Sequence, residues 1–349
     1  MVITMRANNV LGIIYSNAYD SVLSELTNAR TMGSVPFGGR YRLIDFALSN
    51  LVNCGINKVG IITKSNYQSL MDHIGTGKPW DLSRKRGGMF LLPPFNNSHT
   101  GMYRDRIQAL RGIMRFLEQS KEEYIVLMDT NVVCNFDLND MCRAHTESGA
   151  DITIAYHHGR APRLDDLMTF TFEENQKVAK IALDPKTSNP VDYAMNIILI
   201  SKALLTRLIN NAVSLNQDSF VRDVIQHNLK RLNIYGYEVS GFTSVFDSLQ
   251  SYYDISMSLL DPANCQELFT RERPVYTKVR DDMPAIYGLG STVKNSLVAD
   301  GCSIDGEVEN CILFRGVQIG KGAVVRNSII MQGTYISEGC LLYTSDAAD

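Results

Sequence analysis

One carboxylate stands where open α/β sheets bind their ligands. Asp129 directly follows the apolar run 125–128, which is typical of a buried strand. Because ligands of such sheets bind at the carboxyl ends of the strands, Asp129 could hold a metal ion there. An aspartate after a strand is also a common turn or capping residue, so a structural role is the alternative.

Other reactive residue types occur without a supporting pattern. His157 and His158 are adjacent, and neighbouring strand residues point to opposite faces, so they cannot easily share one ion. No G-x-S-x-G elbow is present. The seven cysteines contain no C-x-x-C pair, which favours reduced thiols in a cytoplasmic protein.

Composition narrows the class of protein. The chain has 349 residues, of which 45% are apolar and 20% charged, as in globular proteins of two or three domains. Lys and Arg number 34 against 37 Asp and Glu, so the basic excess of a nucleic-acid binder is missing. No apolar run approaches about 18 residues, so no membrane span or membrane partner is expected.

Residues 1–260 alternate strand-like and helix-like segments. The runs 10–15, 59–63 and 124–128 are apolar throughout, whereas 43–53 and 106–119 have helical spacing. Strands that are apolar on both faces are typical of a mostly parallel sheet covered by helices. We therefore predict a Rossmann-like α/β domain.

The pattern changes near residue 280. Short β-branched runs recur at 291–298, 308–313 and 317–325, separated by Gly, Asn, Ser and Asp. Such runs bury their apolar faces when coils stack, which predicts a left-handed parallel β-helix of hexapeptide repeats over 286–349. Residues 261–285 would be the linker. The aperiodic acidic tail suggests a truncated or altered C-terminus.

One segment carries a specific resemblance. Residues 35–50 read VPFGGRYRLIDFALSN, and the match continues through 72–75, 91–94 and Tyr103-Arg104. This pattern resembles bacterial ADP-glucose pyrophosphorylases (glucose-1-phosphate adenylyltransferases) over about residues 8–340. The resemblance implies a nucleotidyltransferase domain followed by a β-helix. It also implies Mg²⁺-dependent joining of glucose 1-phosphate to ATP, giving ADP-glucose and pyrophosphate.

The phosphate-binding groups of that family are mostly replaced. Its glycine-rich loop corresponds to residues 17–22, where Asp20 takes the place of a glycine and Val22 that of an arginine. The position of the catalytic lysine is Met32. Nucleotidyl transfer depends on cations and backbone amides that hold phosphates, so these changes predict little or no activity.

Further positions agree. The sugar-phosphate lysine corresponds to Asp184 and the second metal aspartate to Val245, with Asp247 displaced by two residues. Asp129 matches the remaining metal aspartate. No catalytic set is therefore expected to be intact, and Mg²⁺ binding is doubtful.

Two arginines match positions of the family's effector-phosphate site. Arg30 and Arg42 could make bidentate phosphate contacts, although the neighbouring activator lysine is Ala29 here. Ordinary salt bridges are the alternative.

Together these matches resemble the GlgD-type regulatory subunits of this family. The resemblance implies a degenerate, modulatory subunit in glycogen biosynthesis. It would assemble with a catalytic GlgC-type subunit, as a heterotetramer, and respond to sugar-phosphate or nucleotide effectors. A weakly active adenylyltransferase with a remodelled loop and a stand-alone sensor are the alternatives.

Overall fold

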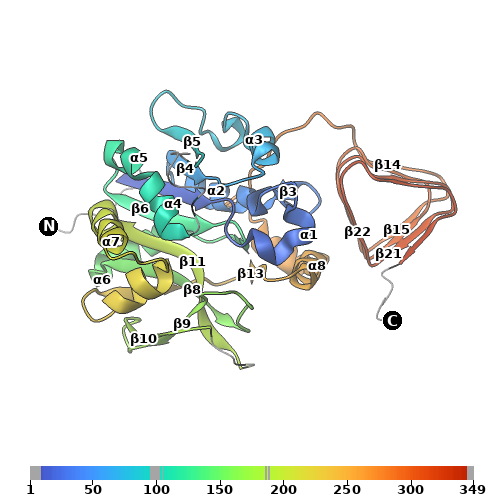
Figure 1. The fold of residues 1–349 in the computed structure, drawn as a ribbon. Coiled ribbons are helices and arrows are strands. Elements are labelled where there is room, and N and C mark those ends of the chain that lie inside the picture. The colour runs from blue at the N-terminus through green and yellow to red at the C-terminus, as the bar shows by residue number, and fades with distance from the viewer. Residues whose placement is uncertain (1–8, 95–102, 104, 185–186, 188, 344–349) are drawn as a thin grey trace.

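A mixed sheet forms the centre of the N-terminal domain (Figure 1). The computed structural model describes residues 9–94, 103, 105–184, 187 and 189–343. The strand order is β10-β9-β11-β6-β1-β4-β5, with β8 on β11 and β12 on β8. Strands β6, β1, β4 and β5 run parallel, as predicted, and β11 runs antiparallel to its neighbours. The sheet consists of β1 (Val10–Tyr15), β4 (Lys58–Ile62), β5 (Gly88–Leu92), β6 (Tyr124–Asp129), β8 (Ile152–Gly159), β9 (Met168–Phe172), β10 (Val178–Leu183), β11 (Val191–Ser201) and β12 (Ile234–Glu238).

Helices cover both faces of this sheet, because successive side chains of a buried strand point to opposite sides. In β1, Leu11 and Ile13 pack with α4, α5 and α7, whereas Val10 and Ile14 pack with α2, α3 and α6. The helices of this domain are α1 (Ser24–Thr27), α2 (Leu43–Asn53), α3 (Gln68–Ile74), α4 (Arg106–Gly112), α5 (Met114–Gln119), α6 (Leu138–Ser148), α7 (Lys202–Ser214), α8 (Leu249–Ser258) and α9 (Pro262–Leu268).

The helix predicted over 106–119 is two helices. It breaks at Ile113, whose φ of −99° and ψ of 8° lie outside the helical region. Gly112 precedes the break, and glycine weakens helices because it loses most backbone freedom on ordering.

Small paired strands surround the carboxyl end of the sheet. The hairpin of β2 (Pro36–Phe37) and β3 (Tyr41–Arg42) precedes α2, and β7 (Val132–Cys134) pairs with β13 (Thr243–Val245). A single π-helical turn, η5 (Phe220–Ile225), follows α7. The hairpin and β7 contribute Phe37, Tyr41 and Val133 to the third apolar cluster of the molecule, whereas Phe220 of η5 packs in the first.

The C-terminal domain is the predicted β-helix. Its strands form three parallel sheets, β14-β17-β20-β23, β15-β18-β21-β24 and β16-β19-β22, around a core of buried apolar side chains and two cysteines. The bounds are β14 (Ile286–Tyr287), β15 (Thr292–Lys294), β16 (Leu297–Val298), β17 (Ser303–Ile304), β18 (Glu307–Glu309), β19 (Ile312–Leu313), β20 (Gln318–Ile319), β21 (Val324–Arg326), β22 (Ile329–Ile330), β23 (Tyr335–Ile336) and β24 (Leu341–Tyr343).

An asparagine row marks one corner of the β-helix. Asn295, Asn310 and Asn327 all have left-handed backbone conformations, with φ between 41° and 52°. The Nδ2 of Asn295 donates to Asn310, and that of Asn310 donates to Asn327. Asparagine tolerates this conformation better than most residues, so the turn and the ladder stabilise each other.

The two domains touch along α8 and the linker. Tyr253 of α8 donates its hydroxyl proton to the carbonyl of Asn327 at 2.7 Å. Within the described part of the chain, no helix is both long and apolar enough to cross a lipid bilayer.

Candidate functional site

The loop after β1 is closed on itself by an aspartate. The Asp20 carboxylate accepts hydrogen bonds from the Met32 backbone at 2.8 Å and from the Asn17 amide at 2.7 Å. Burial raises the pKa of Asp20 to about 6, against the opposing effect of these hydrogen bonds and of Lys64. The carboxylate thus occupies two hydrogen-bond donors of this loop, the Met32 backbone N–H and the Asn17 amide.

Two replaced cation positions belong to an apolar cluster. Met32 is fully buried among Leu23, Phe37 and Phe46, and Val22 packs against the same cluster from its edge. These side chains fill space between the loop and α2. Apolar side chains therefore stand at both positions where the resembling family has cations.

Asp184 and Val245 also have structural roles. Asp184 lies just after β10, and its carboxylate and backbone N–H form a reciprocal pair of hydrogen bonds with Leu167, each 3.0 Å. Val245 is buried in β13 opposite Val132. The nearby Asp247 accepts hydrogen bonds from the Arg163 backbone and the Ser248 hydroxyl, so it closes a loop.

Asp129 ends β6, as predicted, and is fully buried. Its Oδ2 lies 2.5 Å from Nη2 of Arg106, the first residue of α4. Burial alone would lower the pKa of Arg106, but the Asp129 carboxylate outweighs it and raises that pKa, so the guanidinium stays charged. Asp129 is therefore one half of a buried ion pair.

These residues do not fit the Mg²⁺ ion that the family resemblance implies. Mg²⁺ prefers several oxygen ligands in octahedral geometry. Here one Asp129 oxygen faces a cation, and the second metal position is the apolar Val245. Among the described residues, no group of three or more His, Cys, Asp or Glu side chains could hold a metal ion.

The arginines form a second site, between the two domains. A pocket of about 430 Å³ is bounded by α1, the β2–β3 hairpin, α3 and the β-helix. Both predicted residues, Arg30 and Arg42, line it. Three further arginines join them, Arg40, Arg280 and Arg315. Glu25 is the one carboxylate among the described residues of its wall.

The charge of this pocket is only partly compensated. Burial and the neighbouring Arg30 lower the pKa of Arg42, and Asp45 opposes them. Burial likewise lowers the pKa of Arg315, and Asp282 at 3.7 Å opposes it. Arginines that lower one another's pKa favour a bound anion, because the anion would offset the repulsion between their positive charges.

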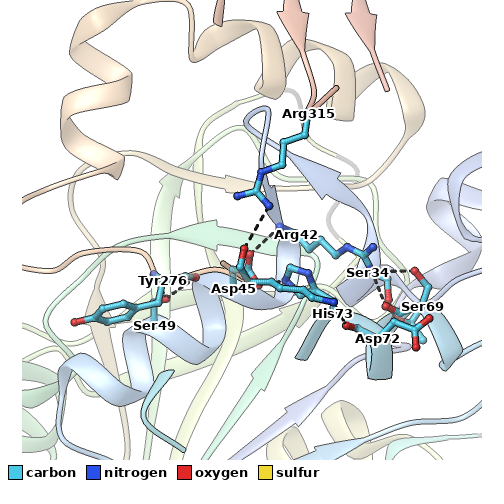
Figure 2. A network of polar contacts seen from close by, with 11 residues as sticks. Ser34, Arg42, Asp45, Ser49, Ser69, Asp72, His73, Tyr276 and Arg315 are labelled. Carbon is cyan, nitrogen blue, oxygen red and sulfur yellow. Dashed lines mark hydrogen bonds and ion pairs between the residues drawn. The ribbon is translucent and has the colours of Figure 1, made fainter. Parts of the chain in front are cut away.

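A polar network holds the pocket in place (Figure 2). Arg42 donates through Nη1 to the Ser69 carbonyl at 2.6 Å and to its hydroxyl at 2.9 Å. Buried Asp45 accepts from the Arg42 backbone N–H and contacts His73 Nε2 at 2.6 Å. Figure 2 shows Arg315 reaching from the β-helix toward this end of α2. The pocket is thus preorganised on α2 and α3.

Four arginines that the structure places at these two sites were not predicted from the sequence. Arg40 stands inside the motif 35–50 and Arg106 inside the segment that begins with Tyr103, so their positions were the available signal. Arg280 and Arg315 belong to the linker and β-helix, and nothing local distinguishes them from surface arginines. Arg104 and the C-terminal tail lie outside the described residues.

Comparisons with known proteins agree with this architecture. The nucleotidyl transferase family model matches residues 12–246, and the model of the GlmU-like C-terminal hexapeptide region matches residues 286–345. The glycogen biosynthesis protein GlgD of Bacillus subtilis (strain 168) is 38% identical over 322 residues, covering 92% of this chain and 84% of that one. GlgD of Geobacillus stearothermophilus is 39% identical over 321 residues, covering 91% and 83%.

Enzymes of the same group are more distant. The glucose-1-phosphate adenylyltransferase of Clostridium acetobutylicum is 31% identical over 327 residues, covering 92% of this chain and 86% of that one. The chain belongs to the nucleotidyl transferase family and, within it, to the group formed by GlgD proteins and glucose-1-phosphate adenylyltransferases.

Proposed function

We propose that this chain is a modulatory, catalytically degenerate subunit of a glucose-1-phosphate adenylyltransferase in glycogen biosynthesis. It would assemble in the cytoplasm with a catalytic GlgC-type chain, as a heterotetramer. The observation that carries the proposal is a contrast between two sites. The family's phosphate-binding cations are replaced by buried Met32, half-buried Val22 and acidic Asp184, while five arginines line the interdomain pocket.

The pocket supports a regulatory role because it joins two domains. An anion bound there would contact arginines of the N-terminal domain and Arg315 of the β-helix together. A sugar phosphate or nucleotide that binds one relative arrangement better would shift the population toward it. In a hetero-oligomer, such a shift could change the activity of the catalytic subunits.

The test is pyrophosphate release from ATP and glucose 1-phosphate with Mg²⁺, measured for this chain alone and mixed with a purified catalytic subunit. We expect no turnover alone and an altered rate or effector response in the mixture. Arg42→Ala should remove the altered effector response, whereas Arg231→Ala, an arginine outside the pocket, should not. Turnover by the chain alone would contradict the proposal, as would sedimentation that detects no complex.

The pocket also favours a second candidate, a stand-alone sensor of sugar phosphates or nucleotides. It differs in one outcome, because a sensor would bind the effector but leave the catalytic subunit's rate unchanged.

A further inference from the structure

The buried ion pair of Asp129 and Arg106 has an unusual setting. Asp129 ends the central strand β6, yet its side chain is 0% exposed, and that of Arg106 is 14% exposed. An unpaired carboxylate at this depth would be strongly disfavoured, and burial by itself raises the pKa of Asp129, so a nearby cation is needed to keep this group charged. In this chain the cation is the guanidinium of Arg106, the first residue of α4.

Packing fixes the guanidinium independently of the ion pair. Its central carbon lies 4.7 Å from the ring centroid of Tyr15 in β1 and 5.7 Å from that of Phe220 in η5. Cation–π contacts of this kind hold an arginine by its flat face. Besides Asp129, two separate elements, β1 and η5, therefore position the charge, and the guanidinium cannot move out to solvent without disturbing them.

The pair leaves one polar edge unused. Among the described residues, Asp129 Oδ1 and Arg106 Nη1 are both buried and have no hydrogen-bond partner. A structural ion pair optimised for stability would satisfy these atoms. A carboxylate inherited from a metal site would instead retain an oxygen that has lost its ligand.

We infer that Arg106 takes the place of a divalent cation at Asp129, so that this strand end is held together without metal. The inference deepens the proposed loss of catalysis. It concerns the isolated chain only, so its failure would leave the proposed partnership with a catalytic subunit untouched.

Mn²⁺ binding tests the inference without substrates or turnover. Free Mn²⁺ would be followed by electron paramagnetic resonance in titrations of the full chain and its variants. We expect wild type and Asp129→Asn to bind equally. Arg106→Met should gain about one site per chain, in the millimolar range, and Arg106→Met with Asp129→Asn should lose it. Arg111→Ala, an exposed arginine on the same helix, should behave as wild type.

Two results would overturn the inference. The first is a Mn²⁺ site in wild type that Asp129→Asn abolishes, since the carboxylate would then bind metal despite Arg106. The second is a folded Arg106→Met variant with no gain of Mn²⁺, since Asp129 would then be an ordinary ion-pair residue.

Thermal melts cover the case in which Arg106→Met folds poorly. Methionine keeps the apolar packing between the two rings but leaves Asp129 unpaired. Millimolar Mn²⁺ should raise the Tm of that variant by about 2–4 °C and leave the double variant unchanged. Equal responses of the two variants would count against the replacement of metal by arginine.

Discussion

At the scale of single residues, the side chains that stand at the family's phosphate-binding positions have structural roles in this chain. Met32 is part of an apolar cluster, and Asp20 ties its loop to the Met32 backbone. Such roles make these side chains part of the folded core and its loops. Replacing one of them by the residue type of the resembling enzymes is therefore expected to reduce stability.

Met32→Lys tests this coupling. The new ammonium would be buried in the cluster around Phe37, so we expect a loss of about 2–4 kcal/mol in unfolding free energy. Met32→Leu, which conserves volume, should cost less than about 1.5 kcal/mol. Urea unfolding followed by the fluorescence of the single tryptophan, buried Trp80, measures both. Equal stability of the two variants would mean that this side chain reaches solvent.

Asp20 predicts a pH dependence of stability. Its folded pKa is about 6, above the unfolded value of about 3.9, so the folded chain holds this proton more tightly. Stability from this group is complete below about pH 4 and is lost as pH rises through 6. Relative to Asp20→Asn, wild type should lose about 1–3 kcal/mol between pH 4 and pH 7. Urea unfolding at both pH values tests this, with Glu174→Gln as the exposed-charge control.

At the scale of elements, α2 organises the arginine pocket. Its N-terminal end is fixed by Asp45, which accepts from the Arg42 backbone and contacts His73 of α3. One buried carboxylate thus joins two elements that line the pocket. The C-terminal half of the same helix holds the linker, because Ser49 accepts from the Tyr276 backbone and Asn53 donates to Pro274.

Asp45→Ala should therefore lower the free energy of unfolding by more than the loss of an ordinary helix cap does. We expect about 2–4 kcal/mol, because the change removes a helix cap and leaves buried His73 without this partner. Asp261→Ala removes the N-cap of α9, whose carboxylate accepts one hydrogen bond from the Ala263 backbone, and should cost about 0.5–2 kcal/mol. Denaturant midpoints of the two variants give the comparison, and equal losses would refute the special role of Asp45.

Elements with a clear local pattern of apolar residues could be predicted from the sequence. The bounds of α2, Leu43–Asn53, and of β1, Val10–Tyr15, match the prediction residue for residue. Strand β11 begins at Val191, well before its apolar run 197–200, and passes through polar residues and a left-handed Asn196 that no alternation pattern predicts. The Asp129–Arg106 pair and the contribution of Arg315 depend on tertiary packing, so local pattern could not predict them.

At the scale of the whole molecule, the arginine pocket is lined by residues of both domains. Arg42 comes from the start of α2 and Arg315 from the β-helix, so a bound anion would bridge them. The pocket then acts as a conditional contact between domains. Binding would stabilise the folded chain as a unit, since neither domain alone supplies the whole pocket.

Pyrophosphate should accordingly raise the Tm of the isolated chain. At a concentration about 100 times its Kd, a shift of roughly 2–5 °C is expected. Arg42→Ala and Arg315→Ala, one from each domain, should each reduce the shift. Arg326→Ala, on the β-helix outside the pocket wall, should leave it intact. A shift that survives both pocket substitutions would place the anion elsewhere.

The asparagine row of the β-helix has a consequence for how the domain tolerates changes in length. Successive asparagines are 15 and 17 residues apart, yet they stack as neighbours. Coils of different length therefore return to the same phase at this corner. We expect an insertion within one coil to bulge locally, because the next asparagine returns the chain to the same corner. The asparagine row thus keeps the strand register of the neighbouring coils unchanged when one coil is longer or shorter.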